Sequence, residues 1–222
     1  MGHNILEGGV LVIGLGRFGR ALAESLTRAG TQVLAVDPRH EVVQEMSNRL
    51  THVVEADWTS EEALRQIGAA DFEVAVVAIG TDIEASIVAT SALVDIGVPH
   101  IWAKAVSPAH GRILSRVGAH HVVLPEQDAG ERVAHLLTEK ILDFIALDDG
   151  FAISKMRAPQ EAWGRSLGEA RLRSKYGVTV VGVKRSGESF TYAQADTVVE
   201  QGDLLIVAAQ ADALERFAAE TS

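Results

Sequence analysis

Apolar and polar positions follow a repeating order over the first 125 residues. Short, almost continuous apolar runs are followed by longer stretches in which apolar residues recur every three or four positions. The short runs predict buried strands, and the longer stretches predict amphipathic helices. The predicted strands cover residues 10–13, 31–37, 51–55, 72–79, 99–104 and 120–124, and the predicted helices cover 18–29, 41–49, a short segment after Ser60, 83–96 and 108–117. This alternation predicts an α/β fold, a Rossmann-like parallel sheet with right-handed crossovers.

The pattern changes after residue 125. Apolar residues at helical spacing predict one long helix over residues 129–145. The residues of this stripe are Val133, Leu136, Leu137, Ile141, Phe144 and Ile145. A polar segment that ends in Gly150 follows the stripe and predicts the end of the helix.

Short elements of both kinds are expected in the last third of the chain. The predicted strands cover 151–155, 179–184 and 204–208, and the predicted short helices cover 166–171 and 212–219. This mixture predicts a small α+β module. We therefore expect three parts: a Rossmann-like domain at 1–126, a connecting helix at 127–147 and a small C-terminal domain at 148–222.

A glycine-rich turn follows the first predicted strand. Gly14, Gly16 and Gly19 have the spacing G-x-G-x-x-G and precede a predicted helix. In this spacing the first glycine allows a tight turn, the second leaves room for a phosphate, and the third lets the helix approach the strand. Asp37 ends the second predicted strand about 20 residues later, where a carboxylate is expected to bind a ribose diol. The pattern predicts a nucleotide site, the alternative being a structural turn with an incidental Asp37.

The composition limits the classes of protein that fit. The chain has 222 residues, a net charge of −10 and a pI near 5.2, which argues against general nucleic-acid binding through a basic face. No apolar run approaches the roughly 18 residues of a membrane span, so we expect no direct membrane insertion. The absence of cysteine excludes thiol catalysis and thiolate metal sites.

The residues offer little support for an enzyme. A dehydrogenase needs a proton donor or acceptor beside its nicotinamide, and the histidines of this chain are scattered without a recognisable spacing. The C-terminal module is also small for a substrate domain. An NAD-dependent oxidoreductase is therefore the alternative rather than the leading hypothesis. A nucleotide-responsive transcription regulator is a third hypothesis, and it lacks a basic helix-turn-helix segment.

Three charged positions suggest that the site handles anions and cations. Arg17 lies inside the glycine turn, where a guanidinium could reach a terminal phosphate. Lys104 ends a predicted strand at the carboxyl edge, where open sheets bind ligands, and Glu126 comes just after another strand at the same edge. A phosphate-bound Mg²⁺ or Ca²⁺ needs only one or two carboxylates from the protein. The alternative for each of the three is an ordinary surface residue.

Taken together in order, seven short motifs resemble the RCK (regulator of potassium conductance) subunits of the KtrA/TrkA family. The motifs are GLGRFG at 14–19, AVD at 35–37, VAIG at 77–80, IWAKA at 101–105, PEQDAG at 125–130, LRSKYG at 172–177 and QGDLLIV at 201–207. The resemblance extends over nearly the whole chain. It implies a Rossmann-like N-terminal domain, a crossover helix that mediates dimerisation and a small ligand-sensing C-terminal domain.

The resemblance also implies roles for individual residues. Asp37 would hold the ribose, while Asp57 and Thr59 match the segment beside the adenine. Glu126 matches the family's ligand for a divalent cation, Mg²⁺ or Ca²⁺. Gly16, Arg17 and Phe18 would hold the phosphates. The nucleotide-binding residues expected in this chain are Gly14, Gly16, Arg17, Phe18, Gly19, Asp37, Asp57, Thr59, Gly80 and Lys104.

Ligands and partners follow from the same resemblance. The KtrA branch favours ATP or ADP, and the TrkA branch is associated with NAD(H). The C-terminal domain resembles domains that bind cyclic di-AMP in some members, although Thr179 stands where those members often have Asn and Ala193 where the family often has Pro. The family implies a cytoplasmic homo-oligomer, an octameric ring, that gates a membrane potassium channel or transporter from the inner face of the membrane and catalyses no reaction.

Overall fold

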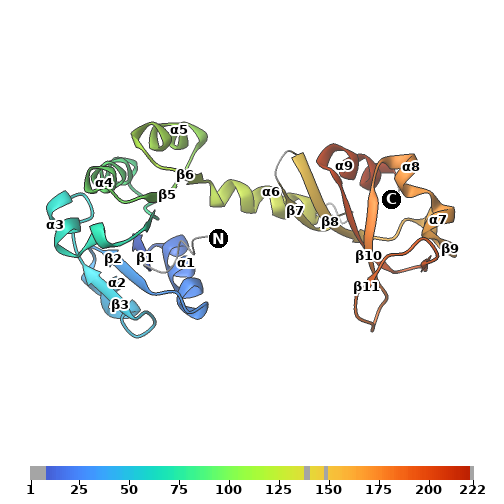
Figure 1. Cartoon of the computed structure of the whole chain (residues 1–222), viewed down its shortest axis with the longest axis horizontal. Coiled ribbons are helices and arrows are strands. Elements are labelled where there is room, and N and C mark those ends of the chain that lie inside the picture. The colour runs from blue at the N-terminus through green and yellow to red at the C-terminus, as the bar shows by residue number, and fades with distance from the viewer. Residues whose placement is uncertain (1–8, 138–140, 148–149, 221–222) are drawn as a thin grey trace. The chain divides into compact units, whose positions relative to one another are not determined.

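The computed structural model describes residues 9–137, 141–147 and 150–220, and the chain forms two compact units, 1–127 and 128–222 (Figure 1). The strands of the first unit are β1 (Val10–Ile13), β2 (Val33–Asp37), β3 (His52–Glu55), β4 (Val74–Val77), β5 (His100–Lys104) and β6 (His121–Val123). Its helices are α1 (Arg17–Arg28), α2 (His40–Met46), α3 (Glu61–Gln66), α4 (Ile83–Ile96) and α5 (Pro108–Val117), with a short 3₁₀ turn at Ala69–Asp71.

The six strands form one parallel sheet in the order β3-β2-β1-β4-β5-β6. Alternate residues of β1 enter two different cores: Leu11 and Ile13 pack with α3, α4 and α5, whereas Val10 and Val12 pack with α1 and α2. The helices therefore cover opposite faces of the sheet, as Figure 1 shows. This parallel sheet with helices on both faces confirms the Rossmann-like fold predicted from the sequence. Strands that are buried on both faces need apolar side chains at almost every position, which explains the near-continuous apolar runs.

Several helices of the first unit begin after a residue whose side chain caps them. The Ser60 side chain accepts a hydrogen bond from the amide of Ala63 at the start of α3, and the predicted short helix begins there. Asp82 caps α4 in the same way by accepting from the amide of Ala85. Helix α1 differs, since its N-cap is Gly16, which has no side chain to satisfy the first amides. Those amides remain available to a ligand.

The second unit contains helix α6 (Pro125–Leu137), which starts just before the division between the units, and an antiparallel sheet. The sheet has the order β11-β10-β13-β8-β7. Its strands are β7 (Ile141–Ala146), β8 (Phe151–Arg157), β10 (Thr179–Lys184), β11 (Thr191–Tyr192) and β13 (Leu204–Gln210), and a separate pair consists of β9 (Arg165–Ser166) and β12 (Val198–Val199). The remaining elements are the 3₁₀ turn Gln160–Ala162 and helices α7 (Leu167–Ala170), α8 (Leu172–Tyr176) and α9 (Ala211–Glu220).

The predicted helix over 129–145 is wrong in its second half. Helix α6 ends at Leu137, and the apolar residues from Ile141 onward form strand β7, which pairs antiparallel with β8. The segment Ile-Leu-Asp-Phe-Ile-Ala is rich in β-branched and aromatic residues, which fit a pleated surface, and the edge of β8 provides its hydrogen-bond partners. A short apolar segment can match both periods, so the stripe alone did not distinguish helix from strand.

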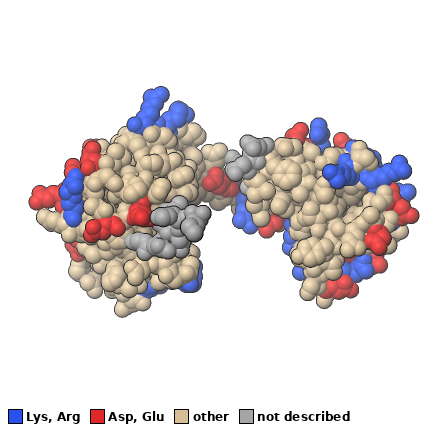
Figure 2. Space-filling view, in the orientation of Figure 1, with Lys and Arg blue, Asp and Glu red and all other residues tan. Residues whose placement is uncertain are grey.

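No helix within the described residues combines the length and apolarity that crossing a bilayer requires. Acidic and basic side chains lie interspersed over the face of the second unit that Figure 2 shows. On that face, the second unit thus shows no continuous basic surface of the kind on which general nucleic-acid binding depends.

We expect Gly19→Ala to destabilise the first unit by about 3 kcal/mol, because a Cβ there would lie 1.8 Å from the carbonyl oxygen of Gly14. The control is Gly16→Ala, where a Cβ would meet none of the described atoms within 4 Å and should cost less than about 1 kcal/mol. Urea unfolding of both variants followed by circular dichroism measures the difference. Equal stability of the two variants would contradict the close approach of α1 to β1.

Candidate functional site

One cavity of about 150 Å³ opens at the carboxyl ends of β1, β2, β4 and β5. It lies where the strand order reverses between β1 and β4, the place at which open α/β sheets bind ligands. The predicted residues that line it are Gly14, Gly16, Arg17, Phe18, Asp37, Gly80, Lys104 and Glu126. The structure therefore brings residues from five separate sequence segments to a single site.

The glycine turn has the geometry that its spacing predicts. Gly14 has a φ of +97°, a backbone conformation that favours glycine, and the chain turns there from β1 toward α1. Gly19 lies outside the cavity lining and has the structural role described above. The space around the Cα of Gly16 is open, so a phosphate could approach the backbone there. Arg17 is the first residue of α1 and lies at the rim of the same opening.

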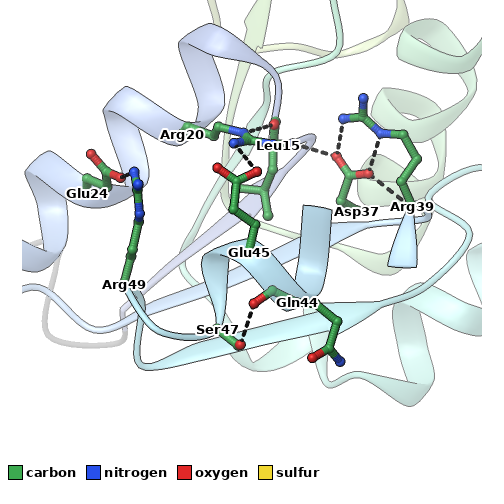
Figure 3. Close-up of polar contacts among 9 residues, drawn as sticks. All are labelled: Leu15, Arg20, Glu24, Asp37, Arg39, Gln44, Glu45, Ser47 and Arg49. Atoms are coloured by element: carbon green, nitrogen blue, oxygen red, sulfur yellow. Dashed lines mark hydrogen bonds and ion pairs between the residues drawn. The ribbon is translucent and has the colours of Figure 1, made fainter. Parts of the chain in front are cut away.

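Asp37 is fully buried and its carboxylate holds the turn in place (Figure 3). Its Oδ2 accepts a hydrogen bond of 2.8 Å from the amide of Leu15 and one of 2.9 Å from Nη2 of Arg39. Its Oδ1 accepts from the amide and from Nε of Arg39, at 3.1 and 2.8 Å. Burial alone would raise the pKa of Asp37, but these hydrogen bonds outweigh it and the pKa lies below its ordinary value.

Lys104 and Glu126 form an ion pair in the lining of the cavity. The Nζ atom of Lys104 lies 2.7 Å from Oε1 of Glu126. The hydrogen bond from this largely buried ammonium lowers the pKa of the exposed Glu126 carboxyl. Gly80 makes room for the lysine, because a Cβ at residue 80 would lie 2.8 Å from Nζ. A cation at Glu126 would have to share this carboxylate with Lys104 or displace the ammonium.

The described part of the chain contains no cluster of three or more His, Asp or Glu side chains arranged to hold a metal ion. A divalent cation at Glu126 would need further oxygen ligands from phosphate or water, as Mg²⁺ commonly takes them.

Asp57 and Thr59 do not line the cavity. Both are exposed, and the Asp57 carboxylate accepts hydrogen bonds from the amide and hydroxyl of Thr59 at 2.9 and 2.6 Å. Trp58, between them, does line the cavity, as does Arg39. Sequence reasoning missed both. The sequence features that could have identified them are an aromatic residue after the third predicted strand, for Trp58, and a basic residue two positions after Asp37, for Arg39.

A second cavity, of about 270 Å³, lies within the C-terminal unit. Its lining includes Leu172, Arg173, Thr179 and Ala193, from α8, β10 and the segment after β11. The two positions that depart from the resembling family, Thr179 and Ala193, therefore border the same space.

We expect Asp37→Asn to lower the stability of the first unit by about 1.5–3 kcal/mol near neutral pH, because the amide NH2 of Asn would face N–H donors at a position where an oxygen of Asp37 now accepts two hydrogen bonds. The folded pKa lies below 3.8, so the carboxylate's contribution is complete above that pH and disappears as the pH falls through the folded value. Urea midpoints measured from neutral to acid pH should converge for wild type and variant. The exposed Asp95→Asn serves as the control, and a constant difference at all pH values would contradict the assignment.

Comparisons with known proteins place the chain in a family. Residues 10–125 match the TrkA-N domain and residues 156–222 match the TrkA-C domain. The chain is 36% identical over 207 residues to Ktr system potassium uptake protein C of Bacillus subtilis, covering 93% of this chain and 94% of the relative. It is 37% identical over 204 residues to Ktr system potassium uptake protein A of Vibrio alginolyticus, covering 91% and 93%.

Solved structures show the same fold. The GsuK RCK domain matches with a TM-score of 0.67 and 20% identity, covering 97% of this chain and 48% of that chain. The GsuK channel bound to NAD matches with a TM-score of 0.69 and 21% identity, covering 97% and 40%. With matching domains in both parts and relatives aligned over almost their full length, this chain belongs to the KtrA/TrkA family of RCK-type potassium-transport subunits.

Proposed function

We propose that this protein is a cytosolic regulatory subunit that senses ATP and ADP and gates a bacterial potassium channel or transporter. The observation that carries the proposal is the cavity at the β1/β4 switch point, where an uncapped helix N-terminus, a buried Asp37 and the basic residues Arg17 and Lys104 meet. This combination fits a ligand with a ribose at one end and several negative charges at the other.

Each part of the nucleotide has a proposed partner. Asp37 accepts hydrogen bonds from the ribose, and Trp58 offers an apolar surface within the lining beside it. The backbone amides that follow Gly16 bind the inner phosphates. Arg17 binds the terminal phosphate of ATP, and Lys104 neutralises any remaining negative charge. Asp57 and Thr59 remain proposed for the segment beside the adenine, where their exposed positions on the loop after β3 leave them accessible.

The relatives support this class of function. Two Ktr potassium uptake proteins align with this chain over more than nine tenths of its length. Among the structures of the same fold, GsuK was solved with NAD and with ADP, which makes an adenine nucleotide the natural class of ligand for the equivalent cavity here. NAD(H) is the alternative ligand to ATP and ADP.

We propose no catalytic reaction. The described residues that line the cavity include no histidine or tyrosine that could exchange a proton with a nicotinamide. The oxidoreductase hypothesis is therefore the weaker one, because the lining residues Asp37, Lys104 and Glu126, which could exchange a proton, are held in ion pairs.

Assembly into a homo-oligomer is proposed from the exposed apolar side chains of α6. Val133 and Leu137 are 51% and 77% exposed. A second copy that covers this helix would make the dimer, and repetition of the dimer would make the octameric ring expected of the family. The ring would bind a membrane potassium channel or transporter at the cytoplasmic face.

Cyclic di-AMP is proposed as the ligand of the second cavity. Arg173 could pair with a phosphate, and the apolar Leu172 and Ala193 border the same space. Thr179 offers one hydroxyl where an Asn would offer an amide, so fewer hydrogen bonds to the base are available.

Calorimetry on nucleotide-stripped protein tests the proposed function. We expect ATP and ADP to bind with a stoichiometry of about one per chain and to compete with each other, because both are proposed to occupy the cavity at the β1/β4 switch point. Titrations with NAD⁺ and NADH under the same conditions decide between the two ligand classes. Absence of binding by all four nucleotides would overturn the proposal.

We expect Mg²⁺ or Ca²⁺ to tighten ATP binding, because a cation between the phosphates and Glu126 removes the repulsion between them. Glu126→Gln should abolish this gain and leave ADP binding unchanged. The substitution Glu126→Gln also releases Lys104 from its 2.7 Å ion pair. Because the released ammonium remains positively charged, the affinity of the variant for ATP in the presence of a chelator should not fall below that of wild type.

The control for the cation experiment is Glu215→Gln, an exposed acid on α9 in the other unit. Titrations of ATP with and without the cation are compared across the three proteins. A cation effect that persists in Glu126→Gln would show that Glu126 is not the ligand.

A further inference from the structure

The buried carboxylate that should receive the ribose is already fully occupied. A carboxylate offers about four acceptor positions, two on each oxygen. In Asp37 all four positions are used. Oδ2 accepts hydrogen bonds from the amide of Leu15 and from Nη2 of Arg39, and Oδ1 accepts from the amide and from Nε of Arg39. Figure 3 shows the guanidinium lying against the carboxylate. A ribose diol therefore finds no vacant acceptor while this side chain stays in place.

The two kinds of donor differ in how easily they can leave. The amides of Leu15 and Arg39 belong to the backbone of the glycine turn and of the start of α2. The Arg39 side chain is 58% exposed, whereas the Asp37 side chain is 0% exposed. The guanidinium can thus swing into solvent without opening a core, while the carboxylate and both amides remain fixed.

Withdrawal of Arg39 would leave one acceptor position on each oxygen of Asp37. A ribose diol has two hydroxyl donors, and the Nε and Nη2 atoms of Arg39 are two donors that meet the same two oxygens at 2.8 and 2.9 Å. The guanidinium fork therefore takes the hydrogen bonds that the diol would make. The cavity volume of about 150 Å³, below the roughly 300 Å³ usual for a ligand pocket, agrees with a site that its own side chains partly fill.

We propose that Arg39 is a specificity-determining residue that competes with the ribose diol for the carboxylate of Asp37. The inference rests on the proposed nucleotide function. Because of this competition, the diol increases the binding free energy only by the amount by which its hydrogen bonds to Asp37 are stronger than those of Arg39. Recognition of the sugar is weak while recognition of the phosphates is unaffected, so the site responds chiefly to the number of phosphates.

The geometry distinguishes this role from binding of a 2′-phosphate, another use of arginine near this position. A phosphate dianion placed there would meet the buried carboxylate of Asp37, and the guanidinium nitrogens that could neutralise the phosphate already serve that carboxylate. Competition for a neutral diol requires no additional charge in the cavity.

The test compares ATP with 2′,3′-dideoxy-ATP, which lacks both hydroxyls, in wild type and in Arg39→Ala. The ratio of the two dissociation constants isolates the diol, because any contact between Arg39 and the base or phosphates affects both nucleotides equally. We expect the preference for ATP to grow on the order of tenfold in Arg39→Ala, since hydrogen bonds to a charged group are strong. Arg39→Met, which keeps the apolar stem, should behave alike.

Arg49→Ala is the matched control: it removes the same charge from an exposed ion pair with Glu24, outside the cavity lining. Its ratio should equal that of wild type, and thermal unfolding checks that each variant is folded. An unchanged or smaller ratio in both Arg39 variants, with ATP still bound, overturns the competition alone. If neither nucleotide binds to wild type or to any variant, the proposed nucleotide function fails and the competition fails with it.

Discussion

The first unit depends on one buried hydrogen bond, from the amide of Leu15 to the carboxylate of Asp37. It connects the glycine turn after β1 to the end of β2, two segments 22 residues apart. The buried charge is tolerable because four hydrogen bonds surround it. This contact fixes the path of the turn and thereby the direction of α1, whose first residues line the cavity. A residue predicted for ligand binding is thus also part of the fold.

Much of the fold could be predicted because burial on both faces of a parallel sheet leaves a clear pattern in the sequence. Helices α4 and α5 have the predicted bounds, and strand β1 has the bounds expected from its apolar run. The error at β7 has a physical cause. Ile141 to Ile145 satisfy a helical stripe, and their strand conformation is decided by pairing with β8, a partner that lies later in the chain. Tertiary pairing overrode the local period.

The candidate site was predictable at the level of position and less so at the level of contacts. The sheet brings the strand ends together, so Gly14, Asp37 and Lys104 lie around one cavity as the order of strands requires. The partners of the charged groups depend on side-chain conformation. Nothing in the spacing shows that Arg39 covers Asp37 or that Lys104 reaches Glu126. Trp58 was missed for the same reason, because an aromatic side chain can turn inward or outward from a loop.

The charge balance of the cavity explains how an acidic chain can hold an anion. The protein carries a net charge of −10, yet the lining combines the cations Arg17, Arg39 and Lys104 with the carboxylates Asp37 and Glu126. Two of the cations pair with the two carboxylates, so these lining groups carry one positive charge in excess, which Arg17 contributes. A bound nucleotide would alter both pairs, because its phosphates would draw Lys104 from Glu126 and its sugar would compete with Arg39 for Asp37. Binding then exchanges internal ion pairs for ligand contacts, and such an exchange gives a regulatory site two alternative arrangements between which a ligand can shift the population.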